Sequence, residues 1–203
     1  MKGSTGRCKV RAHANIALSK YWGKSDLALN LPAVPSISMT LSGLVTETEV
    51  RFDPSLRADS VFLDGRPASA GETRRVVAML DQVRAAAKHE QRAEVRSVNR
   101  FPTAAGLASS ASGFAALAAA ATRAAGLEWD DRRVSALARQ ASASAARSIF
   151  GASPSCPPAS PVRPSWPRVS CTARITGTCA SWWPRPPRAP RRWAPPRAWS
   201  ARA

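Results

Sequence analysis

The alternation of apolar and polar positions in the first 65 residues predicts a β-rich layer. Residues 8–18 alternate loosely and then become apolar, which is typical of a strand that enters the interior. Residues 36–41 and 46–52 predict two more strands, and residues 60–63 predict a short strand that ends in a turn at Asp64. We expect these segments to form one side of the fold.

From residue 71 onward the pattern changes to helical spacing. Apolar side chains recur three and four residues apart at Val76, Val77, Leu80, Val83 and Ala87. They predict a helix of about five turns.

After this helix, the pattern predicts a strand over residues 94–98 and an alanine-rich helix over residues 107–124. A last helix is expected from residue 129 or 130 to residue 142, because two aspartates near its start favour a helix N-terminus. The order of elements predicts an α+β fold in which helices pack on a β layer.

The composition changes abruptly near Gly151. Residues 151–203 contain 12 of the 17 prolines and nine arginines, with no Lys, Asp, Glu, Leu or Phe. A segment so poor in aliphatic side chains cannot build a core. We therefore expect a folded domain over residues 1–151 and a disordered tail over residues 152–203.

The net charge of +17 divides evenly between these two parts, with +8 on residues 1–150 and +9 on the rest. Such a basic chain suggests nucleic acid or a membrane surface as partner. The prolines argue against nucleic acid, because they prevent a continuous basic face on a helix or strand. No apolar run is long enough to span a membrane.

The N-terminus lacks the apolar core of a signal peptide, and the four cysteines show no C-x-x-C spacing. These features disfavour a zinc or redox site. They predict a cytoplasmic protein with reduced thiols.

The stretch FPTAAGLASSASGF at residues 101–114 is the strongest candidate for chemistry. Glycine, alanine and serine leave backbone N–H groups accessible, and a helix that begins here adds partial positive charge. Gly106 can form a tight turn, and nearby serines offer hydroxyls. The stretch is a candidate phosphate cradle, although tight helix packing or a simple N-cap would also explain it. It is not a Walker A loop, since no Gly-Lys-Ser/Thr follows.

The order PTAAGLASSASGFAAL resembles the phosphate-binding motif of the GHMP kinase superfamily, in the form found in diphosphomevalonate decarboxylases. Three further stretches carry the same resemblance: ANIALSKYWGK at residues 14–24, LNLP with SIS at residues 29–38, and SASAARSIFG at residues 142–151. The resemblance covers about residues 8–151.

The resemblance implies a GHMP-kinase-like N-terminal domain and an ATP-dependent decarboxylation of diphosphomevalonate to isopentenyl diphosphate. That reaction belongs to the mevalonate pathway of isoprenoid biosynthesis. The implied cofactors are ATP and Mg²⁺, the substrate is a small molecule, and the family forms homodimers.

The resemblance also implies two sets of binding residues. Those for the substrate are Lys20, Tyr21, Lys24, Ser142, Ser144 and Arg147. Those for the ATP phosphates are Gly106, Ala108, Ser109, Ser110 and Ser112, of which Ser110 is also the candidate metal ligand. The alternatives are a solvated basic loop for the lysines and a surface cation near a helix end for Arg147. His13 and His89 have no paired acid and are expected to be structural or exposed.

The family's catalytic aspartate belongs to a second domain, and no acid occurs after Gly151. This chain is therefore predicted to lack the catalytic residue and to be inactive.

Ala152 stands where the family has a second glycine after Phe-Gly. Residues 174–183, back-translated with GC-rich codons and read at another offset, give Asp-His-Trp-Asp-Val-Arg-Leu-Val-Val, which resembles the family. We interpret the tail as the product of a one-base shift near codon 152.

Two other functions compete with this one. A kinase or decarboxylase of the same superfamily could act on mevalonate or its monophosphate. A basic protein could bind nucleic acid through the arginine-rich tail.

Overall fold

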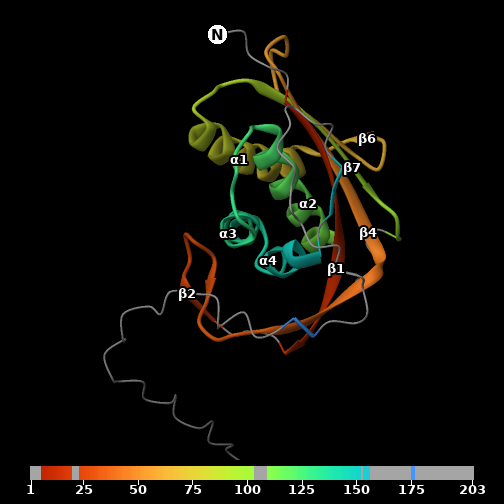
Figure 1. The fold of residues 1–203 in the computed structure, drawn as a ribbon, viewed down its shortest axis with the longest axis vertical. Coiled ribbons are helices and arrows are strands. Elements are labelled where there is room, and N and C mark those ends of the chain that lie inside the picture. The colour runs from red at the N-terminus through yellow and green to blue at the C-terminus, as the bar shows by residue number, and fades with distance from the viewer. Residues whose placement is uncertain (1–5, 20–22, 103–108, 152, 156–174, 177–203) are drawn as a thin grey trace, which may run out of the picture.

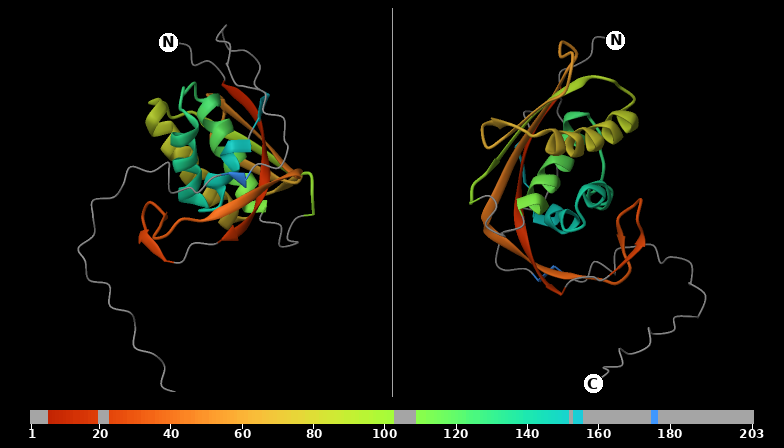
Figure 2. Two further views of the ribbon diagram at one scale, coloured as in Figure 1. Left: turned by 60° about the horizontal axis from the view of Figure 1, so that its bottom comes forward. Right: turned by 180° about the vertical axis from the view of Figure 1, so that it is seen from behind.

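A curved sheet forms one side of the molecule, and the helices pack against its concave face (Figures 1 and 2). The computed structural model describes residues 6–19, 23–102, 109–151, 153–155 and 175–176. The strands of the sheet are β1 (Arg7–Ser19), β4 (Ile37–Asp53), β5 (Ser60–Leu63), β6 (Arg66–Pro67), β7 (Arg92–Asn99), β8 (Ser153–Ser155) and β9 (Ile175–Thr176). Their order is β6-β5-β7-β4-β1-β8, with β9 also paired to β4. The expected α+β fold is confirmed.

The other elements are a small hairpin and the helices. The hairpin consists of β2 (Lys24–Asp26) and β3 (Leu31–Pro32). The helices are α1 (Ala70–Ala87), α2 (Ser109–Ala124), α3 (Asp131–Ala141), the short α4 (Ala145–Ser148) and the 3-10 turn η1 (Ile149–Gly151).

The two strands predicted over residues 36–41 and 46–52 are one strand, β4, so that prediction was wrong. β4 is 17 residues long and runs antiparallel to β1, and the register shifts where His13 pairs with Val45 but Ala14 pairs with Leu41. The shift absorbs the residues between Leu41 and Val45 as a local irregularity. β4 therefore continues alongside β1 instead of ending in a turn after Leu41.

Helix α1 has the predicted length of five turns, and its ends follow from local sequence. Ser69 caps the N-terminus and forms a capping box with Glu72, while Lys88 ends the helix in the left-handed region with φ 56°. Leu80 and Val83 on its inner face are fully buried. The predicted amphipathic pattern is confirmed.

Helix α2 lies at the centre of the core, and most of its buried residues are alanines, with Phe114 and Leu117 as the larger apolar side chains. It packs on both β1 and β4. At its C-terminal end, a Cβ added to Gly6 would overlap the carbonyl oxygen of Ala124. Only glycine fits at position 6 without moving the strand or the helix.

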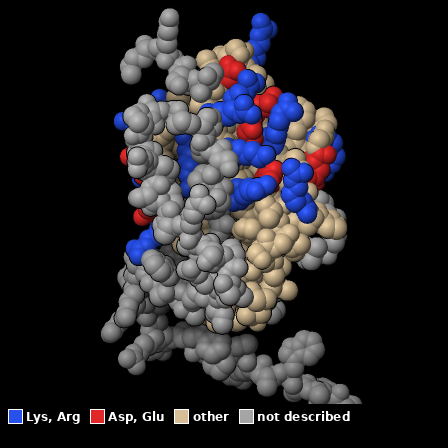
Figure 3. All heavy atoms as spheres, turned by 45° about the vertical axis from the view of Figure 1, so that its right-hand side comes forward, with Lys and Arg blue, Asp and Glu red and all other residues tan. Residues whose placement is uncertain are grey.

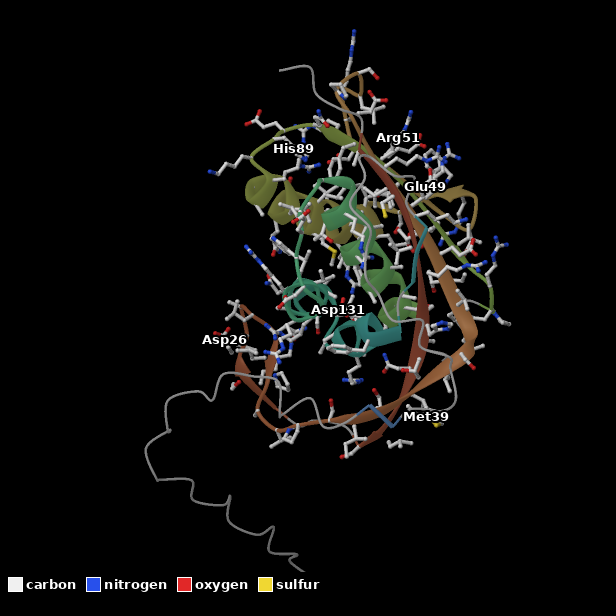
Figure 4. All side chains as sticks on the ribbon, viewed as in Figure 1. Asp26, Met39, Glu49, Arg51, His89 and Asp131 are labelled. Carbon is white, nitrogen blue, oxygen red and sulfur yellow. The ribbon has the colours of Figure 1, made fainter. Side chains whose placement is uncertain are left out.

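The convex face of the sheet is charged. Figure 3 shows Lys and Arg side chains interspersed with Asp and Glu over this face, and Figure 4 shows Glu49 and Arg51 pointing away from the helices. Glu47 is 4% exposed beneath Lys9 (2.9 Å), Arg11 (2.6 Å) and Arg100 (3.0 Å). Hydrogen bonds from these cations lower the pKa of Glu47 to about 2.

The structure differs from two expectations, one about the C-terminal part and one about the cysteines. Strands β8 and β9 lie within residues 152–203, where we expected a disordered tail. Strand pairing uses backbone groups, so it needs no aliphatic core. The other residues from 156 onward lie outside the described ranges. Cys8 is disulfide-bonded, which contradicts the expectation of reduced thiols.

Within the described ranges, none of the helices is both long and apolar enough to cross a bilayer.

Candidate functional site

A cavity of about 180 Å³ lies at the N-terminal end of α2. Its walls come from three parts of the fold: the first turns of α2, one face of α1, and the edge of the sheet at β5 and β7. The residues that contribute polar or charged groups are Thr48, Asp64, Arg66, Glu72, Arg75, Ser97, Asn99, Ser109 and Ser110. A cavity at a helix N-terminus is suited to an anionic ligand, because unpaired backbone N–H groups point into it.

The α2 residues that line this cavity are small. Ser109 and Ser110 are at the first helical positions, and Gly113 lies one turn further on. A Cβ added at Gly113 would meet no atom within 4 Å, so it would project into open space. The first turn of α2 contains no acid that would repel a phosphate. The position predicted to hold ATP phosphates is therefore open at Gly113, lined by the hydroxyls of Ser109 and Ser110, and without an acid in the first turn of α2.

Ser112 differs from the other two serines of this helix. Its side chain is fully buried, and its hydroxyl lies 2.7 Å from the hydroxyl of Thr46 on β4. Thr46 in turn donates to Oδ1 of Asn99 (2.7 Å), whose backbone N–H donates to Asp64 (2.7 Å). In this arrangement Ser112 fastens α2 to the sheet behind the cavity, so its direct contact with phosphate stays a prediction.

A second polar cluster joins the N-terminal signature to the segment after α3. The guanidinium of Arg147 donates to the hydroxyl of Ser36 (3.0 Å) and to Oδ1 of Asn15 (3.3 Å). Asn15 is 4% exposed and donates to the carbonyl of Ser144 (3.0 Å) and the hydroxyl of Ser148 (2.7 Å). Residues more than 100 positions apart are thus brought into one network. Arg147 is not the isolated surface cation that the alternative interpretation required.

Ser142 and Ser144 stand at the entrance to this network. Ser142 caps the C-terminus of α3, its N–H donating to the carbonyl of Ala138 (3.1 Å). The hydroxyls of Ser142 and Ser144 are 3.2 Å apart, and both side chains are half-buried. Two partly exposed hydroxyls next to a guanidinium can bind a carboxylate or a diphosphate.

Lys24 lies on the β2–β3 hairpin and is exposed. Its side chain forms no hydrogen bond or ion pair with the other described residues, so the structure does not join it to the Arg147 cluster. The hairpin itself is fixed to α3, because Asn30 donates to the carbonyl of Arg139 (2.8 Å) and Arg139 donates to the carbonyl of Leu29 (3.0 Å). The other predicted site residues, Lys20, Tyr21, Gly106 and Ala108, lie outside the described residues.

The two histidines take no part in either cluster. Burial lowers the pKa of both His13 and His89, and the ring of His89 packs edge-on against Phe52 with centroids 4.8 Å apart. This placement agrees with the structural role expected for them. Among the described residues, no three His, Cys, Asp or Glu side chains are grouped so that they could hold a metal ion.

Several residues of the two clusters carry no motif and were missed from sequence. Arg75, Asn99 and Thr46 reach the cavity or its rear wall from α1, β7 and β4. Asn15 and Ser36 lie within stretches that the resemblance quoted, but no role was given to them. Only the position of Asn99, directly before the glycine turn, offered a signal.

The family model for the diphosphomevalonate decarboxylase-like N-terminal domain matches residues 12–156. The chain belongs to this family. The match includes both clusters and ends close to the break in composition.

Relatives of known name belong to the same family. The chain is 44% identical over 153 residues to diphosphomevalonate decarboxylase of Eremothecium gossypii, which covers 69% of this chain and 38% of that one. It is 41% identical over 155 residues to the Saccharomyces cerevisiae enzyme, covering 70% and 39%. The chain thus spans about two fifths of the length of these relatives.

Solved structures show the same fold. Mevalonate diphosphate decarboxylase of Staphylococcus aureus is 48% identical with a TM-score of 0.69, covering 72% of this chain and 44% of that one. The Enterococcus faecalis enzyme, described for its mevalonate diphosphate mediated ATP binding mechanism, is 46% identical with a TM-score of 0.68, covering 72% and 46%. A further structure, called MDDEF, is a complex with MVAPP, AMPPCP and magnesium.

Proposed function

We propose that this chain supplies the ATP-binding and substrate-binding half of a decarboxylase that converts mevalonate diphosphate to isopentenyl diphosphate. The observation that carries the proposal is the network in which Arg147 reaches both Asn15 and Ser36. The family's N-terminal signature and its serine-arginine segment, far apart in sequence, there form one anion-binding surface. The family match favours this reaction over that of another GHMP kinase.

The cavity at α2 is the proposed ATP site. Its fit to a nucleotide is supported by the open space above Gly113, the hydroxyls of Ser109 and Ser110, and the helix N-terminus. Bound ATP would supply the phosphoryl group that turns the tertiary hydroxyl of the substrate into a leaving group. Ser110 is the proposed ligand of the accompanying Mg²⁺.

The Arg147 cluster is the proposed substrate site. A guanidinium keeps its charge at any working pH and binds a carboxylate or a diphosphate with two parallel hydrogen bonds. Asn15 and Ser36 hold the plane of this guanidinium, and Ser142 and Ser144 add neutral donors beside it. Lys20, Tyr21 and Lys24 are proposed to approach the same substrate from the preceding loop.

The chain alone is proposed to bind these ligands without turning them over. Residues 151–203 contain no acid, so they cannot supply the aspartate that orients or deprotonates the substrate hydroxyl.

We attribute the missing acid to a one-base shift near codon 152. Resequencing that codon tests the attribution, and an unaltered tail sequence in an intact frame would refute it. Cytoplasmic location and a homodimer stay predictions, the latter testable by light scattering on the purified chain.

The proposal is tested by calorimetric titration of the full chain with mevalonate diphosphate, and separately with AMPPCP and Mg²⁺. We expect saturable one-to-one binding of each and no detectable release of carbon dioxide or ADP with ATP. Binding of the substrate should weaken in Arg147→Lys and stay unchanged in Arg133→Lys, which alters an exposed arginine of α3. A folded chain that binds neither ligand would refute the proposal, and turnover at an ordinary enzymatic rate would refute the claim of inactivity.

A further inference from the structure

Arg75 of α1 contacts the α2 cavity and the residue that precedes the proposed substrate segment. Its guanidinium lies over the ring of Phe114, 4.5 Å from the centroid, and both residues line the cavity at α2. One of its terminal nitrogens donates to the carbonyl oxygen of Ala141 (3.0 Å), the last residue of α3. Arg75 also lines a groove between α1 and α3, on the other side of this contact. It therefore bridges three helices at one point.

The carbonyl that Arg75 holds stands directly before Ser142. The last carbonyls of a helix have no partner inside the helix, and those of α3 find theirs outside it or in its cap. Asn30 of the hairpin bonds the carbonyl of Arg139, and Arg75 bonds that of Ala141. The end of α3, from which Ser142, Ser144 and Arg147 extend, is thus positioned partly by Arg75.

We propose that Arg75 couples the nucleotide cavity to the substrate segment. An anionic ligand in the cavity attracts the exposed guanidinium and fixes it on the face of Phe114, and the same side chain then holds the Ala141 carbonyl and the serines that follow. Each ligand lowers the cost of ordering the segment that the other one needs, so the two bind with positive cooperativity. The inference rests on the proposed function, because it takes ATP and the diphosphorylated substrate as the two ligands.

The chemistry of arginine suits this role better than that of lysine. A guanidinium presents five N–H donors in one plane, so it can stack on a ring, bond a carbonyl and meet a phosphate oxygen together. Arg66, the other cation of the cavity, is already paired with Glu72 at 3.4 Å. Arg75 is the cation of the cavity wall that also touches α3.

The test measures how strongly one ligand changes the affinity for the other. The dissociation constant of mevalonate diphosphate is determined by calorimetry with and without saturating AMPPCP and Mg²⁺, on the full chain. We expect the nucleotide to tighten substrate binding about fivefold in the unaltered chain, the low end of common coupling strengths. In Arg75→Met, which keeps the aliphatic stem, the ratio should fall to about one, and Arg75→Lys should lie between. Arg133→Met is the matched control, since Arg133 stacks on Trp129 at 4.0 Å and does not line the α2 cavity.

A second measurement separates coupling from a general loss of stability. Hydrogen exchange of residues 138–147 should slow when AMPPCP binds to the unaltered chain and should not slow in Arg75→Met. If the unaltered chain binds both ligands independently, or if Arg75→Met keeps the fivefold ratio, the coupling role is refuted while the proposed function stands. If a folded chain binds neither ligand, both proposals are refuted together.

Discussion

Two buried polar clusters on opposite faces of the sheet have opposite charge arrangements. On the convex face, Glu47 is surrounded by Lys9, Arg11 and Arg100, so its negative charge is more than balanced. On the helical side, Arg147 is held by the neutral oxygens of Ser36 and Asn15. Neutral acceptors orient a guanidinium without cancelling its charge.

We expect this difference to distinguish a structural cluster from the proposed ligand site. A buried carboxylate with cationic partners has its interactions satisfied within the protein, and its energy contributes to folding. A cation fixed by neutral groups still attracts an anion, so part of its interaction energy is available for binding. The clusters should therefore respond differently to substitution: one in stability, the other in affinity.

The largest expected effect is on ligand binding at the Arg147 cluster. Replacing Arg147 with Met should weaken mevalonate diphosphate binding about 100-fold, because charge-assisted bonds to a diphosphate or carboxylate are worth about 1.5–3 kcal/mol. The free energy of unfolding in urea should change much less. Calorimetry and urea unfolding of the same preparation measure both. Unchanged affinity in a folded variant would contradict the assignment of this cluster to the substrate.

The Glu47 cluster should show the reverse. Replacing Glu47 with Gln leaves three cations without their common carboxylate and should lower the free energy of unfolding by about 2 kcal/mol. Ligand affinity should stay within twofold. An equal loss of affinity would mean that the convex face contributes to the site.

Acid should act through the same carboxylate. Cationic hydrogen bonds lower the pKa of Glu47 from its ordinary value of 4.5 to about 2. A depressed folded-state pKa stabilises the protein above pH 4.5, and this contribution is lost as the pH falls from 4.5 towards 2. Urea unfolding between pH 6 and pH 2.5 should show that decline, and Glu47→Gln should flatten it. An equal slope in both proteins would contradict the role of Glu47.

A smaller effect of mixed sign is expected at Gly113. Alanine at this position in α2 should raise the free energy of unfolding by about 0.5–1 kcal/mol, since glycine is a poor helix former. Its methyl group would enter the cavity and should weaken AMPPCP binding several-fold. Gly71→Ala is a control at the start of α1, because an added Cβ there meets no atom and this residue does not line the α2 cavity. Stabilisation without any loss of nucleotide affinity would contradict the placement of the nucleotide.

The smallest effect is expected for an exposed pair beside the Glu47 cluster. Arg7 bonds Glu49 through two nitrogens at 2.9 and 3.1 Å, but the arginine side chain is 58% exposed. Glu49→Gln should cost less than about 0.5 kcal/mol, because solvent and salt screen such a pair. A loss as large as that of Glu47→Gln would show that burial is not what distinguishes the two glutamates.

The sequence predicted elements well where their pattern is local. Helix α1 was predictable from its apolar spacing, and α3 begins at Asp131 with Asp130 as its N-cap, at the end that the two aspartates indicated. The continuity of β4 was not predictable, because it depends on a register shift against a strand more than 20 residues away.

The residues of the candidate site also divide into those that carry a local sequence motif and those that do not. The serines at the start of α2 and the segment with Arg147 carry motifs, so the sequence could propose them as site residues. Arg75 and Thr46 act through contacts with distant elements and leave no local pattern. Ser112, which the motif places with the phosphate ligands, contacts Thr46 of the sheet, and its position two residues after Ser110 turns it to the opposite side of the helix from that serine.

The alanines of α2 limit how far the helix can move relative to the sheet, and so how far the cavity can change shape. An alanine has no side-chain torsion, so the contact between α2 and the sheet cannot adjust by changing rotamers. The distance between α2 and the sheet is then defined mainly by backbone and methyl groups, together with the Ser112–Thr46 hydrogen bond near the helix N-terminus. A methylene added at this closely packed interface would shift α2 away from the sheet and displace the amides of its first turn. A change far from the cavity would therefore alter the nucleotide end of the helix.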